Sequence, residues 1–283
     1  NWSYGKLETL NLFIPRLMGG ASQEEGSDKI AEGLQAKMQE NISSEEEYNR
    51  MLPNISKGLQ SGSLTYWGEQ PGTSGPAYQG AVVVFLTLLG FFFAWKKYRY
   101  WILGATILTI GLAWGSNLMF LSDLFIDFVP FYNKFRAPSS ILVVVELLFP
   151  LIAIIGLYRF FNSNQEIETK TENILTEEYK SKTLLYVTGA VLGITAILLM
   201  FGKSILGFAT SLEKTYLPTF LLDYLVDERY KMFQADALKA ILYVGITAVA
   251  MFLVLKKKLN QNVALIVIGL VSFIDLWSVN KRY

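Results

Sequence analysis

The sequence predicts an all-α polytopic membrane protein with six transmembrane helices and an N-terminal extracytoplasmic segment. Hydrophobic residues make up 52% of the 283-residue chain, and only 17% of the residues are charged. Soluble domains carry about a quarter charged residues, so much of this chain is expected to face lipid. The apolar residues also form long runs close to the roughly 20 residues that a helix needs to cross a bilayer.

Six apolar runs define the expected spans. The first, second and fourth are free of charge over 77–95, 100–122 and 183–202, while the third contains Glu146 and the sixth contains Asp275. Residues 1–76 precede them as the extracytoplasmic loop segment, and residues 77–283 form the six-helix region. The expected helices cover about 77–95, 100–122, 137–158, 183–206, 238–255 and 259–279.

The distribution of Lys and Arg predicts the orientation, because short cytoplasmic loops retain positive charges. The loops after the first, third and fifth spans are the most basic, and they lie on one side only if all six spans are real. Both ends of the chain are then expected outside the cytoplasm. The ten basic residues are Lys96, Lys97, Arg99, Arg159, Lys170, Lys180, Lys182, Lys256, Lys257 and Lys258.

Composition also excludes several kinds of chemistry. The chain has no Cys and no His, which rules out disulfides, thiolate nucleophiles and catalysis by imidazole. The net charge of +1 does not indicate the basic surface that nucleic-acid binding requires. Proton transfer would therefore fall to carboxylates, Lys or Tyr, and membrane lipid is the first expected partner.

Local patterns predict structure in the extramembrane segments. Helices are expected over Ser27 to Asn41 and Ser44 to Met51, where Ser44 and Glu47 have the spacing of a capping box. The apolar residues of 222–233 recur at helical spacing, which predicts an interfacial amphipathic helix.

The segment from Trp67 to Pro76, just before the first span, carries the first candidate site. Glu69 and Gln70 could hydrogen-bond sugar hydroxyls while Trp67 stacks on a sugar ring. Glu69 could also help to bind a divalent cation. The alternative is an aromatic-belt Trp followed by a turn that starts the helix.

The aromatic loop from Asp123 to Pro138 carries the second candidate site. It contains Asp127, Asn133, Lys134 and Arg136 among Phe and Tyr residues. The two cations could hold the phosphate of a lipid carrier, with Arg136 able to bind it through two hydrogen bonds. Anchoring to anionic lipid is the alternative.

Further carboxylates leave two interpretations open. Glu8 is a second extracytoplasmic carboxylate, and with Glu69 it could divide the general-base and metal-binding roles of glycosyl transfer. In contrast, Glu146, Asp275 and Asn117 could line the path of a transporter, although structural roles are favoured for all three.

An ordered set of motifs extends over nearly the whole chain. The motifs are Trp2-Ser3-Tyr4-Gly5 with Glu8-Thr9, Ile14-Pro15 with Gly19-Gly20, Tyr66 to Pro71 with Thr73 to Pro76, Leu112 to Gly115, Pro130 to Pro138, and Asp275-Leu276 with Lys281 to Tyr283. This set resembles the YfhO-like family of bacterial membrane proteins. Where the family has the pattern Trp-Gly-Asp-Gln, this chain has Glu69 in place of Asp, and its charge lies one methylene further out.

The resemblance implies a function. Members of the family are similar to GT-C glycosyltransferases, which take a sugar from a polyprenyl-phosphate donor on the extracytoplasmic face. It implies an enzyme of cell-envelope glycosylation in the bacterial cytoplasmic membrane, with an envelope polymer as acceptor. Members are longer, so the chain is expected to be a central portion that works with the rest of the same polypeptide, the principal catalytic loop lying upstream. A transporter or flippase of an envelope precursor, and a non-catalytic scaffold, are the alternatives.

Overall fold

The computed structural model describes residues 2–22, 27–59, 64–134, 136–162 and 175–283. Over these ranges the chain is helical, and an isolated antiparallel bridge joins Gly19 to Tyr66. Short 3-10 helices are labelled η. The elements in chain order are η1 (Leu7–Leu12), α1 (Ser27–Asn41), α2 (Glu45–Leu59), α3 (Ala81–Phe93), α4 (Lys96–Ala113), η2 (Gly115–Leu118), α5 (Met119–Phe128), η3 (Tyr132–Lys134), η4 (Pro138–Leu142), α6 (Val143–Asn162), α7 (Glu177–Leu206), α8 (Ser211–Tyr216), α9 (Thr219–Leu255) and α10 (Gln261–Asn280).

Several helices have the length and apolar character needed to cross a membrane. In the described part of the chain these are four: 138–162, which joins η4 to α6, and the helices α7, α9 and α10. A bent pair formed by α4 and the segment 115–128 would make a fifth. The structure thus confirms an all-helical chain with several candidate membrane helices, while the expected count of six stays a prediction.

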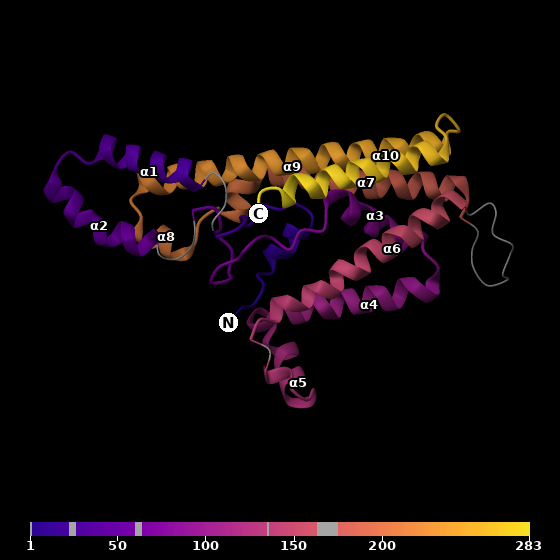
Figure 1. Cartoon of the computed structure of the whole chain (residues 1–283), viewed down its shortest axis with the longest axis horizontal. Coiled ribbons are helices and arrows are strands. Elements are labelled where there is room, and N and C mark those ends of the chain that lie inside the picture. The colour runs from indigo at the N-terminus through magenta and orange to yellow at the C-terminus, as the bar shows by residue number, and fades with distance from the viewer. Residues whose placement is uncertain (1, 23–26, 60–63, 135, 163–174) are drawn as a thin grey trace.

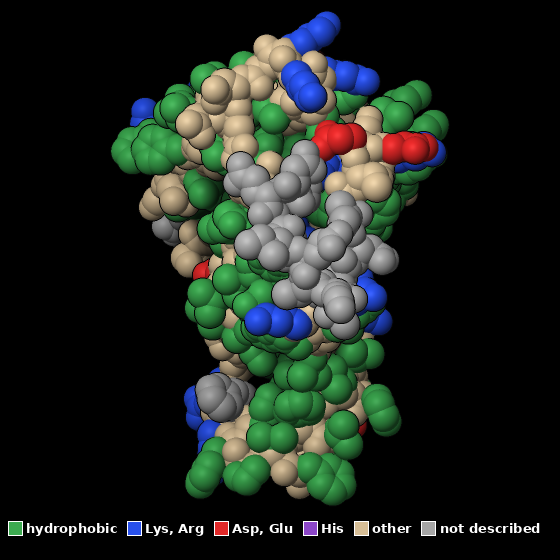
Figure 2. All heavy atoms as spheres, turned by 90° about the vertical axis from the view of Figure 1, so that its right-hand side faces the viewer, with side chains coloured by type: hydrophobic (Ala, Val, Ile, Leu, Met, Phe, Trp, Pro, Cys, Tyr) green, Lys and Arg blue, Asp and Glu red, His purple; other side chains and the backbone are tan. Residues whose placement is uncertain are grey.

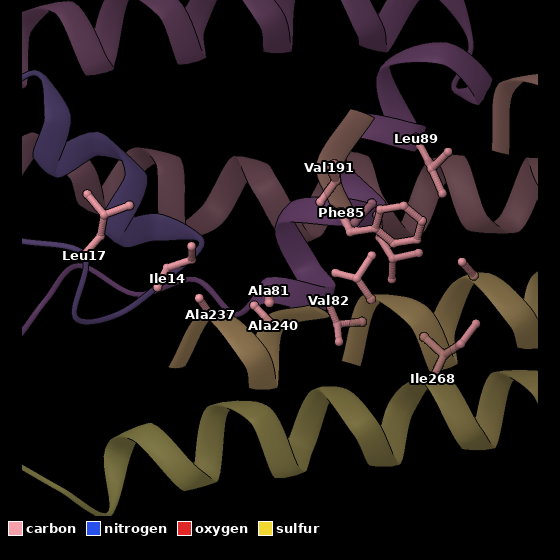
Figure 3. Packing of buried hydrophobic residues seen from close by; sticks show 14 of the residues in the cluster. Ile14, Leu17, Ala81, Val82, Phe85, Leu89, Val191, Ala237, Ala240 and Ile268 are labelled. Carbon is pink, nitrogen blue, oxygen red and sulfur yellow. The ribbon is translucent and has the colours of Figure 1, made fainter. Parts of the chain in front are cut away.

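The first expected span, 77–95, is a short helix at the centre of the bundle. α3 has 13 residues, which correspond to about 20 Å of helix against about 30 Å of hydrocarbon. It contacts α6, α7, α9 and α10, and Figure 3 shows its apolar side chains within the main core. α3 is therefore a buried helix that is shorter than the predicted span.

The second expected span, 100–122, is not one straight helix. α4 ends at Ala113, and the chain then bends by 116° into the segment that contains α5. Gly115 lies at the bend with a φ of 48°, a backbone conformation that glycine adopts without steric cost. The apolar run hides this break, because Gly115 itself is compatible with a membrane helix.

α9 differs most in length from its expected span, 238–255. It has 37 residues, or about 55 Å of helix, so it extends well past a bilayer. Residues 222–233 belong to this continuous helix, which confirms a helix there, and Val226, Tyr230 and Phe233 pack against the core. Its location at a membrane interface stays a prediction. α7 and α10 cover the expected spans 183–206 and 259–279 closely.

The three basic loops gather at one end of the bundle. In Figure 1 the turn between α3 and α4, the end of α6, the start of α7 and the turn between α9 and α10 lie together on the right. Figure 2 looks onto this end and shows Lys and Arg side chains around it. The described parts of the loops therefore share a side as their charges predicted, and Lys170 lies outside the described residues.

The helices α1, α2 and α8 cover the first half of α9 at the opposite end (Figure 1). A separate apolar cluster joins α1 and α2 to α8 and α9 through Ile30, Leu34, Ile55, Leu217 and Leu221. The bounds of α1 agree with the expected helix, and Ser44 accepts a hydrogen bond from the Glu47 backbone, as a capping residue does. α2 continues to Leu59, beyond the expected end at Met51.

Buried ion pairs fasten the N-terminal segment and the loops to α9. Asp236 accepts hydrogen bonds from Arg16 and Arg282, each at 2.7 Å. Arg229 is fully buried, donates to Glu213 at 2.7 Å and also donates to the carbonyl oxygen of Leu64. Removing one partner of a buried ion pair costs about 3–5 kcal/mol, so these contacts hold residues 1–76 to the bundle.

The close approach of α3 and α6 allows a stability test. A Cβ atom on Gly156 would overlap Cα of Gly90, and one on Gly90 would overlap the carbonyl oxygen of Ile152. We expect Gly156→Ala to separate the helices and to cost about 1–3 kcal/mol, seen as a lower Tm in detergent. Gly189→Ala is the control, because its Cβ would meet nothing within 4 Å. Equal Tm values for the two variants would contradict this packing.

Candidate functional site

The buried carboxylate of Glu8 is the centre of the candidate site. It lies in η1 and accepts hydrogen bonds from the backbone N–H of Gly5 at 2.7 Å and of Glu69 at 3.0 Å. The hydroxyl of Tyr66 donates to it at 2.5 Å. A buried charge is costly unless donors surround it, and these three contacts join two segments that lie about 60 residues apart in sequence.

The loop around Gly68 is shaped to receive Glu8. A Cβ atom at Gly68 would overlap both a Glu8 carboxylate oxygen and the Tyr66 hydroxyl, so a larger residue would push the loop away. The Tyr66 hydroxyl also accepts a hydrogen bond from the backbone N–H of Gln70 at 2.9 Å. The turn from Tyr66 to Gln70 therefore folds around the Glu8 carboxylate.

Glu69 presents the exposed carboxylate of the site. Its Oε2 accepts a hydrogen bond from Nδ2 of Asn117 at 2.6 Å, and Asn117 also donates to the carbonyl of Tyr4 at 3.0 Å. A Cβ on Gly5 would lie 3.2 Å from the carboxyl carbons of both Glu8 and Glu69. The two predicted carboxylates thus both lie next to Gly5, one buried and one open to solvent.

The N-terminal motif is fastened to the end of α4. The backbone N–H of Tyr4 donates to the carbonyl of Ala113 at 2.9 Å. The Ser3 hydroxyl accepts from the backbone N–H of Ser116 at 2.9 Å, and the Trp114 indole donates to the Thr9 hydroxyl at 2.9 Å. These contacts place Asn117, which follows the bend after α4, within reach of Glu69.

The second predicted group lies at the end of α5 and on the chain that follows it, with Asp127 in the last turn of the helix. Asp127, Asn133, Lys134 and Arg136 are all exposed. The side chain of Gln70 accepts a hydrogen bond from Ser139, three residues after Arg136, at 3.3 Å. Gln70 therefore joins the turn around Glu8 to the segment that carries the two cations.

Trp67 lies inside the protein. Its side chain is 4% exposed, packs against Phe208 with ring centroids 5.6 Å apart, and receives the Arg229 guanidinium over its ring. Stacking on a sugar requires an open ring face, which this arrangement does not provide. Trp67 therefore packs inside the protein and supports the turn from Tyr66 to Gln70. The prediction that its ring stacks on a sugar needs correction.

The buried tyrosines of the site keep their protons at neutral pH. Burial and the nearby Glu8 carboxylate raise the pKa of the Tyr4 and Tyr66 phenols well above their usual value. The Tyr66 proton is therefore retained as a donor to Glu8. The Tyr4 hydroxyl is buried and, among the described residues, has no hydrogen-bond partner.

The residues of the transport hypothesis lie in different surroundings. Asp275 is buried and accepts hydrogen bonds from the Tyr78 hydroxyl at 2.5 Å and the Val82 backbone at 3.4 Å. Glu146 lies in the first turn of α6 and is exposed. Asn117 donates a hydrogen bond to the Glu69 carboxylate. Asp275 and Asn117 thus have structural partners, as their favoured interpretation implies.

Metal-binding groups are sparse. Within the ranges the structure describes, no three Asp or Glu side chains come together as they would around an ion. Glu69 and the amide of Asn117 form the open polar pair of the site. The arrangement is suited to hydrogen bonding and proton transfer by one exposed carboxylate.

The sequence alone did not identify three members of this site, Tyr66, Asn117 and Ser139. The available signal is local: Tyr66 lies within a motif three residues before Glu69, and Asn117 follows a Gly-Ser pair at the end of an apolar run. The partners of the three residues lie 48 to 69 residues away in sequence, and no periodic pattern links residues so far apart.

Replacing Tyr66 tests the buried contact. Tyr66→Phe removes the donor to Glu8 and the acceptor for the Gln70 N–H, and leaving such buried groups unpaired costs about 1–3 kcal/mol. Thermal or denaturant unfolding should show this loss, whereas Tyr48→Phe on α2 should behave as the wild type. A wild-type stability for Tyr66→Phe would remove Tyr66 from the network.

The raised tyrosine pKa values predict a dependence on alkaline pH. The folded state keeps the Tyr66 proton where the unfolded chain loses it near pH ~10. The stabilisation is therefore complete below about pH 10 and declines as the pH rises further. Between about pH 9 and about pH 11, the free energy of unfolding should fall less steeply with pH in Tyr66→Phe than in the wild type. The two slopes should differ by up to about 1.4 kcal/mol per pH unit. Equal slopes would contradict a protected phenol.

Comparisons of the chain with protein-family models, with curated proteins and with solved structures find no match. Function is therefore inferred from the residues, their arrangement and the resemblance of the sequence motifs.

Proposed function

We propose that this chain is part of a membrane glycosyltransferase that uses a sugar linked to a polyprenyl phosphate. The observation that carries the proposal is the pair of carboxylates around Gly5. Glu69 is exposed and oriented by Asn117, while Glu8 is buried and supplied with three donors. An open carboxylate on a fixed support is what general-base catalysis requires.

The two carboxylates take different roles in the proposed reaction. Glu69 accepts the proton of the acceptor hydroxyl, and Glu8 acts as a positioning residue because its oxygens are already bound to protein donors. The acceptor oxygen bonds to the anomeric carbon as the bond from that carbon to the phosphate oxygen breaks. The polyprenyl phosphate departs with the electron pair, and the proton moves to Glu69.

Lys134 and Arg136 hold the donor phosphate in this proposal. Both side chains are exposed. Ser139, which donates a hydrogen bond to Gln70, lies three residues after Arg136. Arg binds phosphate oxygens through paired hydrogen bonds, and Lys supplies a compact positive charge. Asp127, Asn133 and Gln70 remain candidates for contacts with the sugar or acceptor. The two cations neutralise the charge that builds up on the leaving phosphate.

The basic loops support a location for the reaction. Their gathering at one end of the bundle supports a cytoplasmic position for that end. The site then faces the extracytoplasmic side of a bacterial cytoplasmic membrane, where an envelope polymer would be the acceptor. The resemblance to YfhO-like proteins points to the same reaction, with the rest of the polypeptide supplying further catalytic residues.

Sugar transfer by the complete protein tests the proposal. Glu69→Gln keeps the hydrogen bond with Asn117 possible but removes the base, so the rate should fall about 10²- to 10⁴-fold. Arg136→Ala should also reduce transfer because it weakens phosphate binding. The measurement is incorporation of sugar into envelope polymer in cells or membrane vesicles.

Two exposed residues on α1 provide matched controls. Glu32→Gln and Lys29→Ala make the same changes of charge away from the site and should leave transfer unchanged. Unchanged transfer in both Glu69→Gln and Arg136→Ala would remove these residues from the mechanism. Loss of activity in Glu146→Gln with a mild effect of Glu69→Gln would favour a transporter.

A further inference from the structure

α5 leaves the bundle crosswise at the end of α4. The segment from Gly115 to Phe128 is bent by 116° from α4, and the Ser122 hydroxyl bonds the carbonyl of Gly115 at 2.8 Å, which stabilises the corner. Figure 1 shows α5 projecting away from the other helices where α4 and α6 end. Since α4 runs along the bundle, α5 lies roughly across the direction in which the bundle would cross a bilayer.

One face of α5 is apolar, and this face is turned towards the bundle side. Leu121, Leu124, Phe125 and Phe128 follow the i, i+3, i+4, i+7 pattern of a single helix face. A Cβ atom on Gly111 of α4 would lie 2.9 Å from Leu121 Cδ2, so Leu121 rests against α4. The apolar face therefore looks back along α4, in the direction of the hydrocarbon.

Charged residues occupy the other side of α5. Asp123 and Asp127, four residues apart, are both exposed. At 100° per residue they lie more than a quarter turn from the centre of the apolar face. Met119 and Ile126 share that side, so α5 is apolar around most of its circumference, and its two carboxylates mark the side that faces water.

The apolar side chains of this region are uncovered by the protein. Phe120 is 80% exposed, and Phe128 and Phe131 are each 77% exposed. Within the described residues the principal contacts of α5 are with η2, η3 and α4. Hydrophobic side chains also dominate the lower end of the surface in Figure 2, where Figure 1 places α5. Burying exposed Phe side chains is favourable because it removes apolar surface from water, so a cover for this surface would stabilise the protein.

Two cations complete the surface. Lys134 in η3 and Arg136 just beyond it are exposed and follow the last of these Phe residues. Basic side chains next to an inserted apolar face lie at the depth of lipid phosphates. Charge complementarity thus selects a lipid surface as the occupant.

We propose that α5 is an in-plane anchor that inserts its apolar face between lipid headgroups and acyl chains at this end of the bundle. Lys134 and Arg136 then lie at the depth of the lipid phosphates, where the donor phosphate of the proposed function is also held. The anchor does not depend on sugar transfer, and it would hold the end of α4, and with it Asn117, at the level of the membrane surface.

The absence of cysteine allows a site-specific test in the full chain. Phe128→Cys and Asp123→Cys place single thiols on the two sides of α5, and each is labelled with an environment-sensitive fluorophore after reconstitution. The vesicles contain phosphatidylcholine and phosphatidylglycerol, with or without spin-labelled acyl chains. Tyr48→Cys on the distant helix α2 is the aqueous control.

The proposal requires a strong contrast between the two sides of the helix. The label at residue 128 should emit at shorter wavelength, be quenched by spin-labelled acyl chains and resist iodide, while labels at 123 and 48 should be quenched by iodide. Equal iodide quenching at 128 and 123 would place α5 in water and overturn the proposal. If the label at residue 128 is quenched neither by iodide nor by the spin-labelled acyl chains, then protein covers it, and this result also overturns the lipid anchor.

Discussion

The burial of the Glu8 carboxylate is the constraint on which the candidate site depends. A charge removed from water must be surrounded by donors, and here the donors come from Gly5, Tyr66 and Glu69. Because two of them belong to the turn around Gly68, the carboxylate determines how that turn lies on the N-terminal segment. The same turn carries Glu69 outward, where Asn117 meets it. The buried acid thus sets the position of the exposed one.

Support for this centre comes from both the membrane helices and the helices outside them. Residues at and just after the end of α4 form hydrogen bonds with Ser3, Tyr4 and Thr9. Trp67 packs against the buried side chains of Arg229 and Phe208 and so supports the turn that carries Glu69. The extension of α9 past a bilayer thickness makes this possible, since Arg229 and Asp236 lie in its first half. A helix that ended at the membrane surface could not hold the N-terminal segment by these ion pairs.

The apolar runs predicted helices well and their ends less well. α7 and α10 agree closely with their expected spans because each is a long apolar run with a single charged residue inside it, Lys203 and Asp275 respectively. The run 100–122 continues through a sharp bend, and 77–95 is realised as a buried helix of 13 residues. Hydropathy measures the average environment of a segment, so it does not detect a change of direction at Gly115 or the enclosure of α3 by other helices. For the site, the carboxylates were identified, but Trp67 was assigned to a surface that it does not reach.

By itself, the sequence determined the helical class, the membrane environment, the exclusion of thiol and imidazole chemistry and the grouping of basic loops. These follow from composition and local pattern, which depend on neighbouring residues only. Tertiary structure decided which carboxylate is buried, that Asn117 orients Glu69, and that α5 turns across the bundle. Those features depend on contacts between residues 48 to 113 positions apart. No periodicity along the chain encodes such distances, because they arise only when the helices pack.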